Sequence, residues 1–340
     1  GRSVRAMSAG RASANALPDA APALLAGLDA GLAAVEERLR EVVASGHPML
    51  DLASHHLVEA GGKRVRPMLA LLCSRLGDPE APGVVDAAVV VELTHLATLY
   101  HDDVMDEADV RRGAPSANAR WTNTLAILTG DFLFARASDL TAGLGTEATH
   151  LQARTFARLV EGQISETAGP ADGQDPITHH LQVIADKTGS LIATSARLGA
   201  QMAGASAEHV QTVDRFGELY GVAFQLSDDL IDIASESDES GKTPGTDLRE
   251  GVRTLPVLLV LASDDPADAA LQALLTGDLT DDAALSDALG RLRVHPAMAR
   301  AQQTLVEQVD RARAVAEQLP AGDVRSALLD LSDYVLARSG

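Results

Sequence analysis

Two clusters of aspartate residues are the most distinctive chemical feature of this 340-residue chain. In each cluster, three carboxylates stand at positions i, i+1 and i+4, directly after a largely apolar segment. On an α-helix, residues i and i+4 lie about 6 Å apart along the axis, and residue i+1 lies about 100° around from i. The spacing therefore predicts two helix ends that each carry three neighbouring carboxylates. These residues are Asp102, Asp103 and Asp106 in the first cluster and Asp228, Asp229 and Asp232 in the second.

The repetition of the pattern is what makes it informative. Acidic residues number 48 of 340, so about one triplet with this spacing is expected by chance. Carboxylates crowded at the end of a buried helix repel one another and resist desolvation unless cations meet them. All-oxygen sites suit magnesium, which commonly bridges protein carboxylates to substrate phosphates. The two clusters thus predict magnesium sites for a phosphate-bearing substrate, and two solvated acidic helix ends are the alternative interpretation.

Basic residues that suit an anionic substrate occur in compact blocks. The segment GGKRVRP, residues 61–67, places Lys63, Arg64 and Arg66 after two glycines and before a predicted helix. Side chains and free backbone N–H groups can converge on an oxyanion there. The block is not a Walker A loop, because GxxxxGK[ST] is absent. A solvated surface role is the alternative for any single cation. The other candidates are Arg111, Arg112, Lys187 and Lys242, with His95 two turns before Asp102.

The elements that must position these residues are predicted to be helices. Aromatic residues make up 3% of the chain, Ala and Leu dominate, and alternating β-branched runs are scarce. Glycine and proline mark breaks at 77–83 and 169–173. Residues 263–285 are rich in Asp, which predicts a solvated connection. The predicted helices cover residues 21–43, 48–60, 67–75, 84–106, 121–142, 146–166, 177–203, 207–233 and 255–262, and more follow to Ala337.

Composition and charge limit the function classes. The chain is 46% hydrophobic, enough for a large core, and residues 1–17 read as a mobile N-terminal tail. A formal net charge of −20 argues against nucleic-acid binding, which needs clustered cations. No uncharged apolar run approaches the ~18 residues of a membrane span, so no transmembrane segment is predicted. The only cysteine, Cys73, cannot form an intrachain disulfide, which fits a reducing, cytoplasmic compartment.

The order of these blocks resembles that of the trans-isoprenyl diphosphate synthases, the polyprenyl synthetase family. The likeness covers nearly all of residues 48–260, through the motifs GGKRVRP, DDVMD, RRG, KTGSL, FQLSDDLID and GKTPGTDL. The resemblance implies an all-α, single-domain bundle of mostly antiparallel helices around a central cavity over residues 18–340, usually as a homodimer. It implies a prenyltransferase that extends an allylic diphosphate, such as farnesyl diphosphate, with isopentenyl diphosphate. Three magnesium ions per active site are implied as well.

The resemblance also implies a role for each motif residue. The six aspartates would bind the magnesium ions of the allylic diphosphate. Lys63, Arg66, His95 and Arg112 would hold isopentenyl diphosphate. Arg111, Lys187 and Lys242 would hold the allylic diphosphate, with Thr188 and Gln225 beside the reacting carbons. The residues expected to act directly in the reaction are Asp102, Asp103, Asp106, Lys187, Thr188, Gln225 and Asp228. The chain departs from many relatives at Val252, where they carry a lysine; Arg253 follows it.

The chemistry of these groups predicts a mechanism. Magnesium and protein cations neutralise pyrophosphate as it leaves, which lowers the barrier to ionisation of the allylic C–O bond. The resulting carbocation is shielded from water by an apolar pocket. The double bond of isopentenyl diphosphate attacks it, and a proton is then lost to the departed pyrophosphate.

The helix before the first cluster bears on product length. In the family, the growing chain runs along this helix, and Ala97 lies five residues, or about 7.5 Å, before Asp102. Ala97, beside Thr98, offers no aromatic plug of the short-chain type, and residues 91–100 most resemble long-chain synthases. We expect a product of six or more prenyl units, made for a quinone side chain. A helix-packing role for Ala97 is the alternative interpretation.

Three rival functions stay open at this point. A geranylgeranyl diphosphate synthase stays open, because the floor of the product pocket is set by other helices that the sequence does not place. A class I terpene cyclase would share the fold and the first aspartate motif, but it normally has an Asn/Asp, Ser/Thr, Glu triad at the second site and no isopentenyl clamp. A subunit of a heteromeric synthase usually has damaged aspartate motifs, whereas both are intact here. We also expect transient membrane contact when a long product is released.

Overall fold

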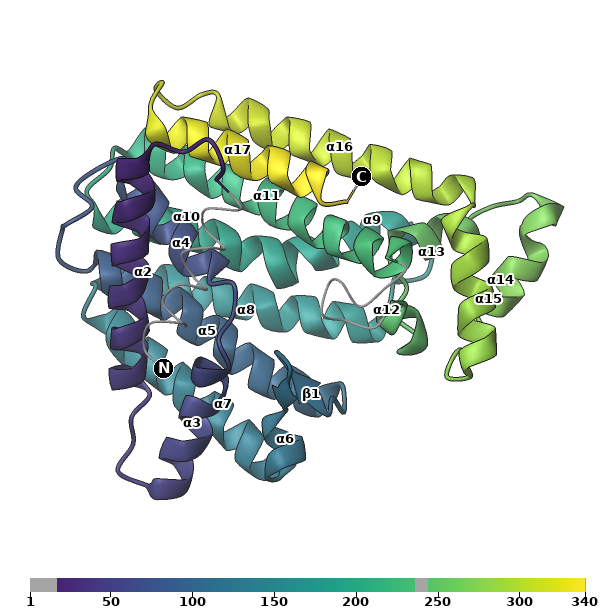
Figure 1. Cartoon of the computed structure of the whole chain (residues 1–340), viewed down its shortest axis with the longest axis horizontal. Coiled ribbons are helices and arrows are strands. Elements are labelled where there is room, and N and C mark those ends of the chain that lie inside the picture. Colours follow the sequence, from purple (N-terminus) through teal and green to yellow (C-terminus); the bar gives the residue numbers. More distant parts are fainter. Residues whose placement is uncertain (1–16, 236–243, 340) are drawn as a thin grey trace. The chain divides into compact units, whose positions relative to one another are not determined.

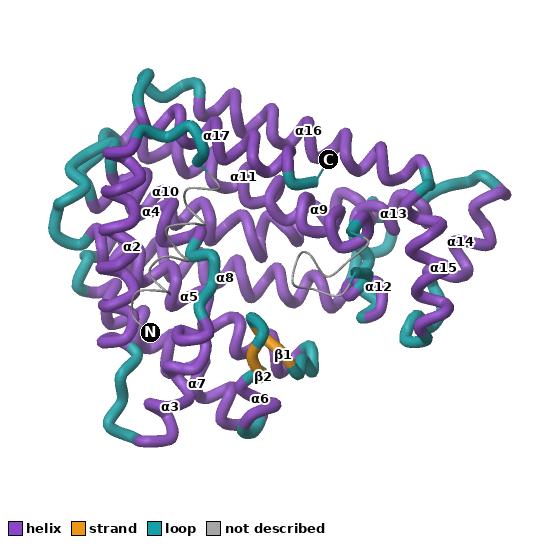
Figure 2. The backbone as a smooth tube through the Cα atoms, in the orientation of Figure 1, coloured by secondary structure: helices purple, strands orange, loops and turns teal. Residues whose placement is uncertain are grey.

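The computed structural model describes residues 17–235 and 244–339 and consists almost entirely of helices (Figure 1). Among these residues, strands occur only in one short hairpin, β1 (Val110–Arg111) with β2 (Ala114–Pro115) (Figure 2). The predicted all-α fold is thus confirmed. The predicted tail lies outside the described residues except for Leu17, which is buried.

The described residues gather into two compact units. The first unit comprises the chain up to Arg158, Ser190–Gly217 and Val315–Leu331, and the second comprises Leu159–Gly189, Glu218–Ala314 and the residues from Ser332 on. The first aspartate cluster belongs to the first unit and the second cluster to the second unit. One catalytic domain over residues 18–340 stays a prediction.

Helix α5 (Val84–Met105) is the core of the first unit. Helices α2, α4, α7 and α10 all pack against it. Its most apolar window reaches a mean hydropathy of 1.2, enough for a membrane span by length and composition, but 67% of that window is buried inside the structure. The burial explains why the helix is apolar on nearly every face. The first unit's other helices are α2 (Pro22–Val42), α3 (Pro48–Ala60), α4 (Val65–Ser74), α6 (Ala117–Arg120), α7 (Asn123–Ala142) and α10 (Ser190–Met202).

Glycines set the spacing of the helices around α5. A Cβ atom on Gly199 of α10 would lie 2.1 Å from the Ala70 carbonyl oxygen of α4. A Cβ atom on Gly130 of α7 would lie 2.4 Å from the His101 ring. These helices therefore approach more closely than any residue with a side chain would allow.

The second unit contains a break in helical geometry that the sequence pattern did not predict. A single helix was expected over residues 177–203, whereas α9 (Pro176–Ile184) is followed by a π-helical turn, Ala185–Gly189, before α10 begins. Single π turns are rare and often lie at functional sites. This turn carries Lys187 and Thr188. A Cβ atom on Gly162 of α8 (Thr146–Ala168) would lie 2.9 Å from atoms of Asp186 and Lys187, so α8 packs tightly beside the turn.

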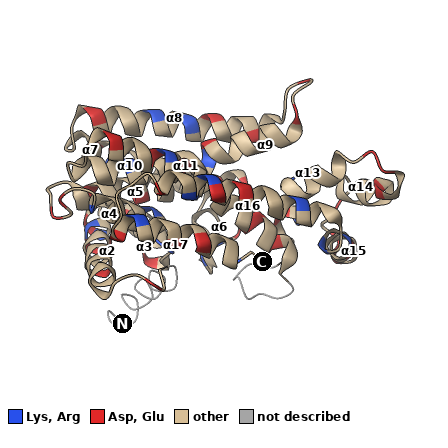
Figure 3. Cartoon of the chain, turned by 90° about the horizontal axis from the view of Figure 1, so that it is seen from above, with Lys and Arg blue, Asp and Glu red and all other residues tan. Residues whose placement is uncertain are grey.

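The remaining helices of the second unit follow the amphipathic pattern. In α16 (Pro296–Ala316) every third or fourth residue is buried, including Leu305 and Val309, and acidic and basic residues both lie along its ribbon (Figure 3). Helices α8, α11 (Ala207–Ala234), α16 and α17 (Asp323–Ala337) contribute residues to both units. The others are α12 (Thr246–Arg249), α13 (Leu255–Leu261), α14 (Ala269–Leu275) and α15 (Asp282–Arg293).

The prediction of a solvated connection over residues 263–285 was wrong in part. A 3₁₀ turn, Pro266–Asp268, leads into α14, and Leu271 and Leu275 of α14 are buried. Four of the six aspartates in this segment lie at the starts of the short helices; Asp281, for example, accepts a hydrogen bond from the backbone N–H of Ala284. Helix caps favour Asp for this reason, so its abundance here marks helix starts rather than loop alone.

The close packing at Gly199 predicts a stability difference between two glycine substitutions. Gly199→Ala should lower the free energy of unfolding by about 1–3 kcal/mol, because the added methyl group meets backbone atoms that cannot rotate away. Gly290→Ala is the matched control, since Gly290 is an exposed position of α15 with nothing within 4 Å of its Cβ position. It should raise the free energy of unfolding by about 0.5–1 kcal/mol. Urea titration followed by circular dichroism measures both, and equal effects would contradict the packing argument.

Candidate active site

The first aspartate cluster lies where α5 ends. Asp102 is half-buried, Asp103 is fully buried, and Asp106 is the exposed residue that caps the helix. Asp103 Oδ1 accepts hydrogen bonds from Arg111 Nε at 2.8 Å and Arg111 Nη2 at 2.5 Å. Burial raises the pKa of the Asp103 carboxyl, while the bonds from Arg111 act in the opposite direction. The buried Asp103 carboxylate is thus paired with Arg111, one of the residues predicted to bind the substrate diphosphate.

The β-hairpin delivers the two arginines to this region. Its strands pair Arg111 with Ala114, which leaves Arg112 and Gly113 as a two-residue turn. Both turn residues have positive φ, 55° and 73°. This is the type I′ pattern that matches the twist of a hairpin. Glycine accepts such a backbone freely, whereas arginine pays about 1–2 kcal/mol for it, so other contacts must hold Arg112 there.

The Arg112 side chain makes those contacts at the end of α3. Its Nη1 donates to the carbonyl oxygen of Leu57 at 3.2 Å and to that of Gly61. Its Nη2 lies 3.7 Å from Glu92 Oε1. A cation suits the carbonyl end of a helix, where the dipole is negative. Arg112 therefore joins the hairpin to the start of the GGKRVRP block.

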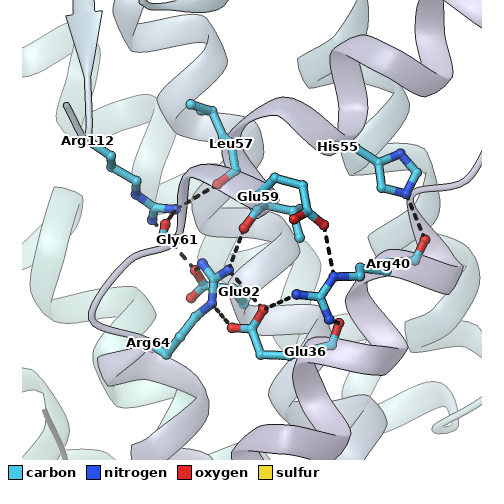
Figure 4. A network of polar contacts seen from close by, with 10 residues as sticks. Glu36, Arg40, His55, Leu57, Glu59, Gly61, Arg64, Glu92 and Arg112 are labelled. Atoms are coloured by element: carbon cyan, nitrogen blue, oxygen red, sulfur yellow. Dashed lines mark hydrogen bonds and ion pairs between the residues drawn. The ribbon is translucent and has the colours of Figure 1, made fainter. Parts of the chain in front are cut away.

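A buried ion network lies beneath that block (Figure 4). Arg64 is buried and donates to Glu92 Oε1 at 2.8 Å, to Glu36 Oε1 at 2.5 Å and to the Val58 carbonyl oxygen at 3.1 Å. Its backbone is left-handed, with φ of 51°. Of the three cations in the block, Arg64 thus points into the core, and its two carboxylate partners offset the cost of burying it.

Sequence reasoning missed Glu36 and Glu92 as partners. Glu92 carried a usable signal, because it is an isolated carboxylate inside the apolar segment 87–97. A buried carboxylate requires a cationic partner. Glu36 carried no comparable signal, since its helix α2 has several other acidic residues.

Arg66 and His95 form the part of the first unit that is suited to an anion. Arg66 Nε is buried and has no hydrogen-bond partner among the described residues. Burial, with Arg112 nearby, lowers the pKa of Arg66 to about 10, which still leaves it charged at neutral pH. Burial and then Arg66 and Arg112 hold the pKa of His95 well below its ordinary value, so its imidazole is neutral. Lys63 lies exposed in the same block. The local excess of positive charge favours an anionic ligand.

The second aspartate cluster lies near the end of α11, and each of its carboxylates meets a different group. Asp228 Oδ1 lies 2.9 Å from Arg338 Nη2. Asp229 is buried; its Oδ1 accepts from Gln225 Nε2 at 2.9 Å, and its Oδ2 lies 3.8 Å from His180 Nε2. Asp232 is also buried and accepts from the backbone N–H of Asp247 at 3.2 Å. Neither His180 nor Arg338 was expected here, because both lie outside the recognised motifs.

The other predicted residues of the second unit gather on the π-helical turn and on α11. Lys187 Nζ lies 3.0 Å from Glu166 Oε1, and Thr188 Oγ1 donates to Gln225 Oε1 at 3.4 Å. Gln225 thus joins Thr188 to the second cluster. Lys242 lies outside the described residues. Arg253 is exposed.

The carboxylate clusters fit divalent cations that arrive together with an anionic ligand. Within residues 17–235 and 244–339, no three His, Cys, Asp or Glu side chains are arranged to hold one ion. The donor set is nevertheless all oxygen, which suits magnesium. Asp103 Oδ2 is buried and has no hydrogen-bond partner in the described part of the chain. Incomplete ligand sets of this kind are completed by phosphate oxygens and water in magnesium sites.

Ala97 does not lie open in the structure. Its side chain is fully buried. Its carbonyl oxygen lies 3.2 Å from the position of a Cβ on Gly130, at the close approach of α5 and α7. This arrangement fits the helix-packing alternative, so Ala97 by itself gives no support to a long product.

Comparison with known proteins identifies the family. The sequence matches the Polyprenyl synthetase family over residues 47–292. The chain belongs to this family. It is 49% identical over 316 residues to a nonaprenyl diphosphate synthase from Mycobacterium tuberculosis, and the match covers 93% of this chain and 94% of that protein. The predictions of the family and of an enzyme are confirmed.

Two solved structures of polyprenyl synthetases are similar over nearly the whole chain. One is a geranylgeranyl pyrophosphate synthase from Corynebacterium glutamicum in complex with calcium and isoprenyl diphosphate, with 47% identity, a TM-score of 0.85 and coverage of 94% of this chain and 98% of that one. The other is a decaprenyl diphosphate synthase from Rhodobacter capsulatus, with 36% identity, a TM-score of 0.84 and coverage of 93% and 98%.

The buried network predicts that Glu92→Gln will be strongly destabilising. The substitution removes the charge that Arg64 and Arg112 share, and breaking a buried ion pair from one side costs about 3–5 kcal/mol. Asp287→Asn is the matched control, because its pair with Arg291 is half-exposed on α15. It should cost less than about 1 kcal/mol. Chemical denaturation measures both, and a Glu92→Gln loss no larger than the control would show that the network contributes little.

The environment of His95 predicts a pH-dependent loss of stability. Because its pKa is lowered in the folded protein, the unfolded chain binds the proton more readily. The contribution of His95 is fully present above the unfolded pKa of about 6.5, and it is lost as the pH falls from there toward the lower folded pKa. The expected slope is up to about 1.4 kcal/mol per pH unit.

Urea titrations between pH 7.5 and 5 test this expectation. His95→Gln should flatten the pH dependence of the free energy of unfolding, whereas His150→Gln, at an exposed position of α8, should leave it as in the wild type. Parallel curves for the wild type and His95→Gln would contradict the assignment.

Proposed function

We propose that this chain is a trans-polyprenyl diphosphate synthase that condenses an allylic diphosphate with isopentenyl diphosphate in successive head-to-tail steps. The observation that carries the proposal is the family match over residues 47–292, which spans both aspartate clusters and the cationic block without a damaged motif. A class I terpene cyclase is disfavoured by the three aspartates of the second cluster and by the GGKRVRP block.

Isopentenyl diphosphate is assigned to Arg66, His95, Lys63 and Arg112 of the first unit. The buried Arg66 Nε that lacks a partner supports this role, since a phosphate oxygen would satisfy it. A neutral His95 can still donate an N–H hydrogen bond to a phosphate without adding another charge to the arginines around it. The Arg112 side chain is already held in place, because it contacts a carbonyl oxygen at the end of α3 and lies near Glu92.

The allylic diphosphate is assigned to the two aspartate clusters with Arg111, Lys187 and Lys242. Three magnesium ions, when bound, would neutralise the diphosphate and so favour ionisation of the allylic C–O bond. Gln225 and Thr188 suit the reacting carbons, because the amide oxygen that faces Thr188 presents a negative dipole to developing positive charge. The proton lost after attack goes to the departed pyrophosphate.

A long-chain product, of six or more prenyl units for a quinone side chain, is the favoured outcome. The nonaprenyl and decaprenyl synthases among the relatives support it. The similar geranylgeranyl synthase supports the shorter alternative. We further propose a cytoplasmic homodimer with transient membrane contact at product release. The intact motifs count against a non-catalytic subunit of a heteromeric synthase.

A prenyl ladder is the expected result when the protein is incubated with magnesium, radiolabelled isopentenyl diphosphate and farnesyl diphosphate. Asp102→Ala and Asp228→Ala should each abolish incorporation. Either substitution removes a carboxylate that would bind magnesium, and the magnesium ions would stabilise the negative charge of the leaving pyrophosphate. Asp172→Ala, in an exposed loop, should retain the ladder. Thin-layer chromatography of the dephosphorylated products measures chain length.

The outcomes separate the parts of the proposal. Absence of incorporation with every allylic starter would refute the catalytic assignment. A ladder that ends at four units would refute the long-chain product and favour the geranylgeranyl alternative.

A further inference from the structure

The C-terminal end of α17 places a guanidinium on the second aspartate cluster. Arg338 follows the last residue of α17, and its Nη2 lies 2.9 Å from Asp228 Oδ1. The same nitrogen donates to the Phe224 carbonyl oxygen at 2.9 Å, and the guanidinium carbon lies 4.1 Å from the centroid of the Phe224 ring. Three separate contacts therefore fix one side chain against α11.

The packing of α17 on α11 makes this placement specific. Ser227, the residue before Asp228, is buried, and its hydroxyl donates to the Val335 carbonyl oxygen at 3.3 Å. The Arg338 side chain is only 13% exposed, whereas that of Asp228 is 41% exposed. Arg338 Nε is buried and lacks a hydrogen-bond partner among the described residues. The arginine is thus held from inside, while its carboxylate partner stays open to solvent and to a ligand.

Arg338 supplies a permanent positive charge where three carboxylates are crowded. The partners of Asp229 and Asp232 described above include the neutral amide of Gln225 and the backbone N–H of Asp247. Arginine cannot lose its proton in a protein. Asp228 is therefore paired with a permanent positive charge, and any cation that binds Asp228 must compete with this guanidinium.

We propose that Arg338 is a positioning residue that makes the second cluster select a cation carried by a diphosphate over a cation alone. This inference rests on the proposed function, since it takes the cluster to bind divalent cations. A bare cation would displace the guanidinium from Asp228 and leave it without a carboxylate partner, with only its contacts to Phe224 remaining. A cation that arrives with diphosphate brings anionic oxygens, which the displaced guanidinium can bind.

Removing the guanidinium should move two affinities in opposite directions. Without Arg338, a cation alone meets no competitor, so Arg338→Gln should bind Mn²⁺ about two- to fivefold more tightly, the range that a partly exposed ion pair supports. Inorganic pyrophosphate in saturating Mg²⁺ loses a phosphate contact, so its affinity should fall by at least a similar factor. A merely structural loss would weaken both.

The experiment uses the full-length chain. Free Mn²⁺ is counted by electron paramagnetic resonance, and pyrophosphate binding is measured by calorimetry in saturating Mg²⁺. Arg338→Lys is the matched control: it keeps the charge, so both affinities should stay closer to those of the wild type than to those of Arg338→Gln. Circular dichroism establishes that each variant is folded.

Unchanged or weaker Mn²⁺ binding in Arg338→Gln would overturn the inference, as would equal behaviour of the Gln and Lys variants. Asp228→Asn distinguishes this failure from failure of the proposed function. If the wild type transfers prenyl groups and Asp228→Asn loses Mn²⁺ affinity while Arg338→Gln does not gain it, only the role of Arg338 is refuted. If the wild type transfers none, the proposed function fails independently.

Discussion

The free-energy cost of burying the Glu92 carboxylate determines how the charged residues of the first unit are arranged. Glu92 stands in the middle of α5, a largely buried helix of that unit, and its burial would be prohibitive without cations. Arg64 and Arg112 supply them, from the start of α4 and from the hairpin turn. Both arginines adopt left-handed backbone conformations to do so. One buried charge thus fixes the shape of two loops that carry proposed substrate ligands.

The basic residues of the first unit have different roles in this arrangement. Arg64 neutralises the core, and Arg112 joins the hairpin to the end of α3 while it also faces Glu92. Arg66 has a buried nitrogen that lacks a partner among the described residues, and His95 is kept neutral beside it. The residues committed to structure therefore hold in place the residues that remain available for an anion.

The second unit also contains crowded carboxylates, the three aspartates of the second cluster, but their partners are of different kinds. Its carboxylates are engaged by an amide, by a backbone N–H group and by the guanidinium of Arg338. The π-helical turn places Thr188 within reach of Gln225, and Gly162 lets α8 pack beside that turn. The candidate site side chains are thus oriented by irregular backbone and by contacts between residues far apart in the chain.

The sequence by itself determined most of the helices, the family and the residues whose side chains could do chemistry. Helix periodicity and Pro or Gly breaks are local, so α3, at Pro48–Ala60, could be predicted to the residue, and the aspartate spacing could be recognised without a fold. Only the tertiary structure decided which charges meet. Arg64 and Arg66 stand two residues apart, yet one lies in the buried network and the other keeps a buried nitrogen without a partner.

The same limit explains the residues that sequence reasoning missed. Glu36, His180 and Arg338 reach their partners across 28, 49 and 110 positions, the differences between their residue numbers and those of Arg64, Asp229 and Asp228. No periodic pattern encodes such a contact, because burial and charge pairing depend on which helices pack together. The π-helical turn was missed for a related reason. Its irregular geometry accompanies the close packing of α8 at Gly162, and no local pattern in its own residues signals such packing.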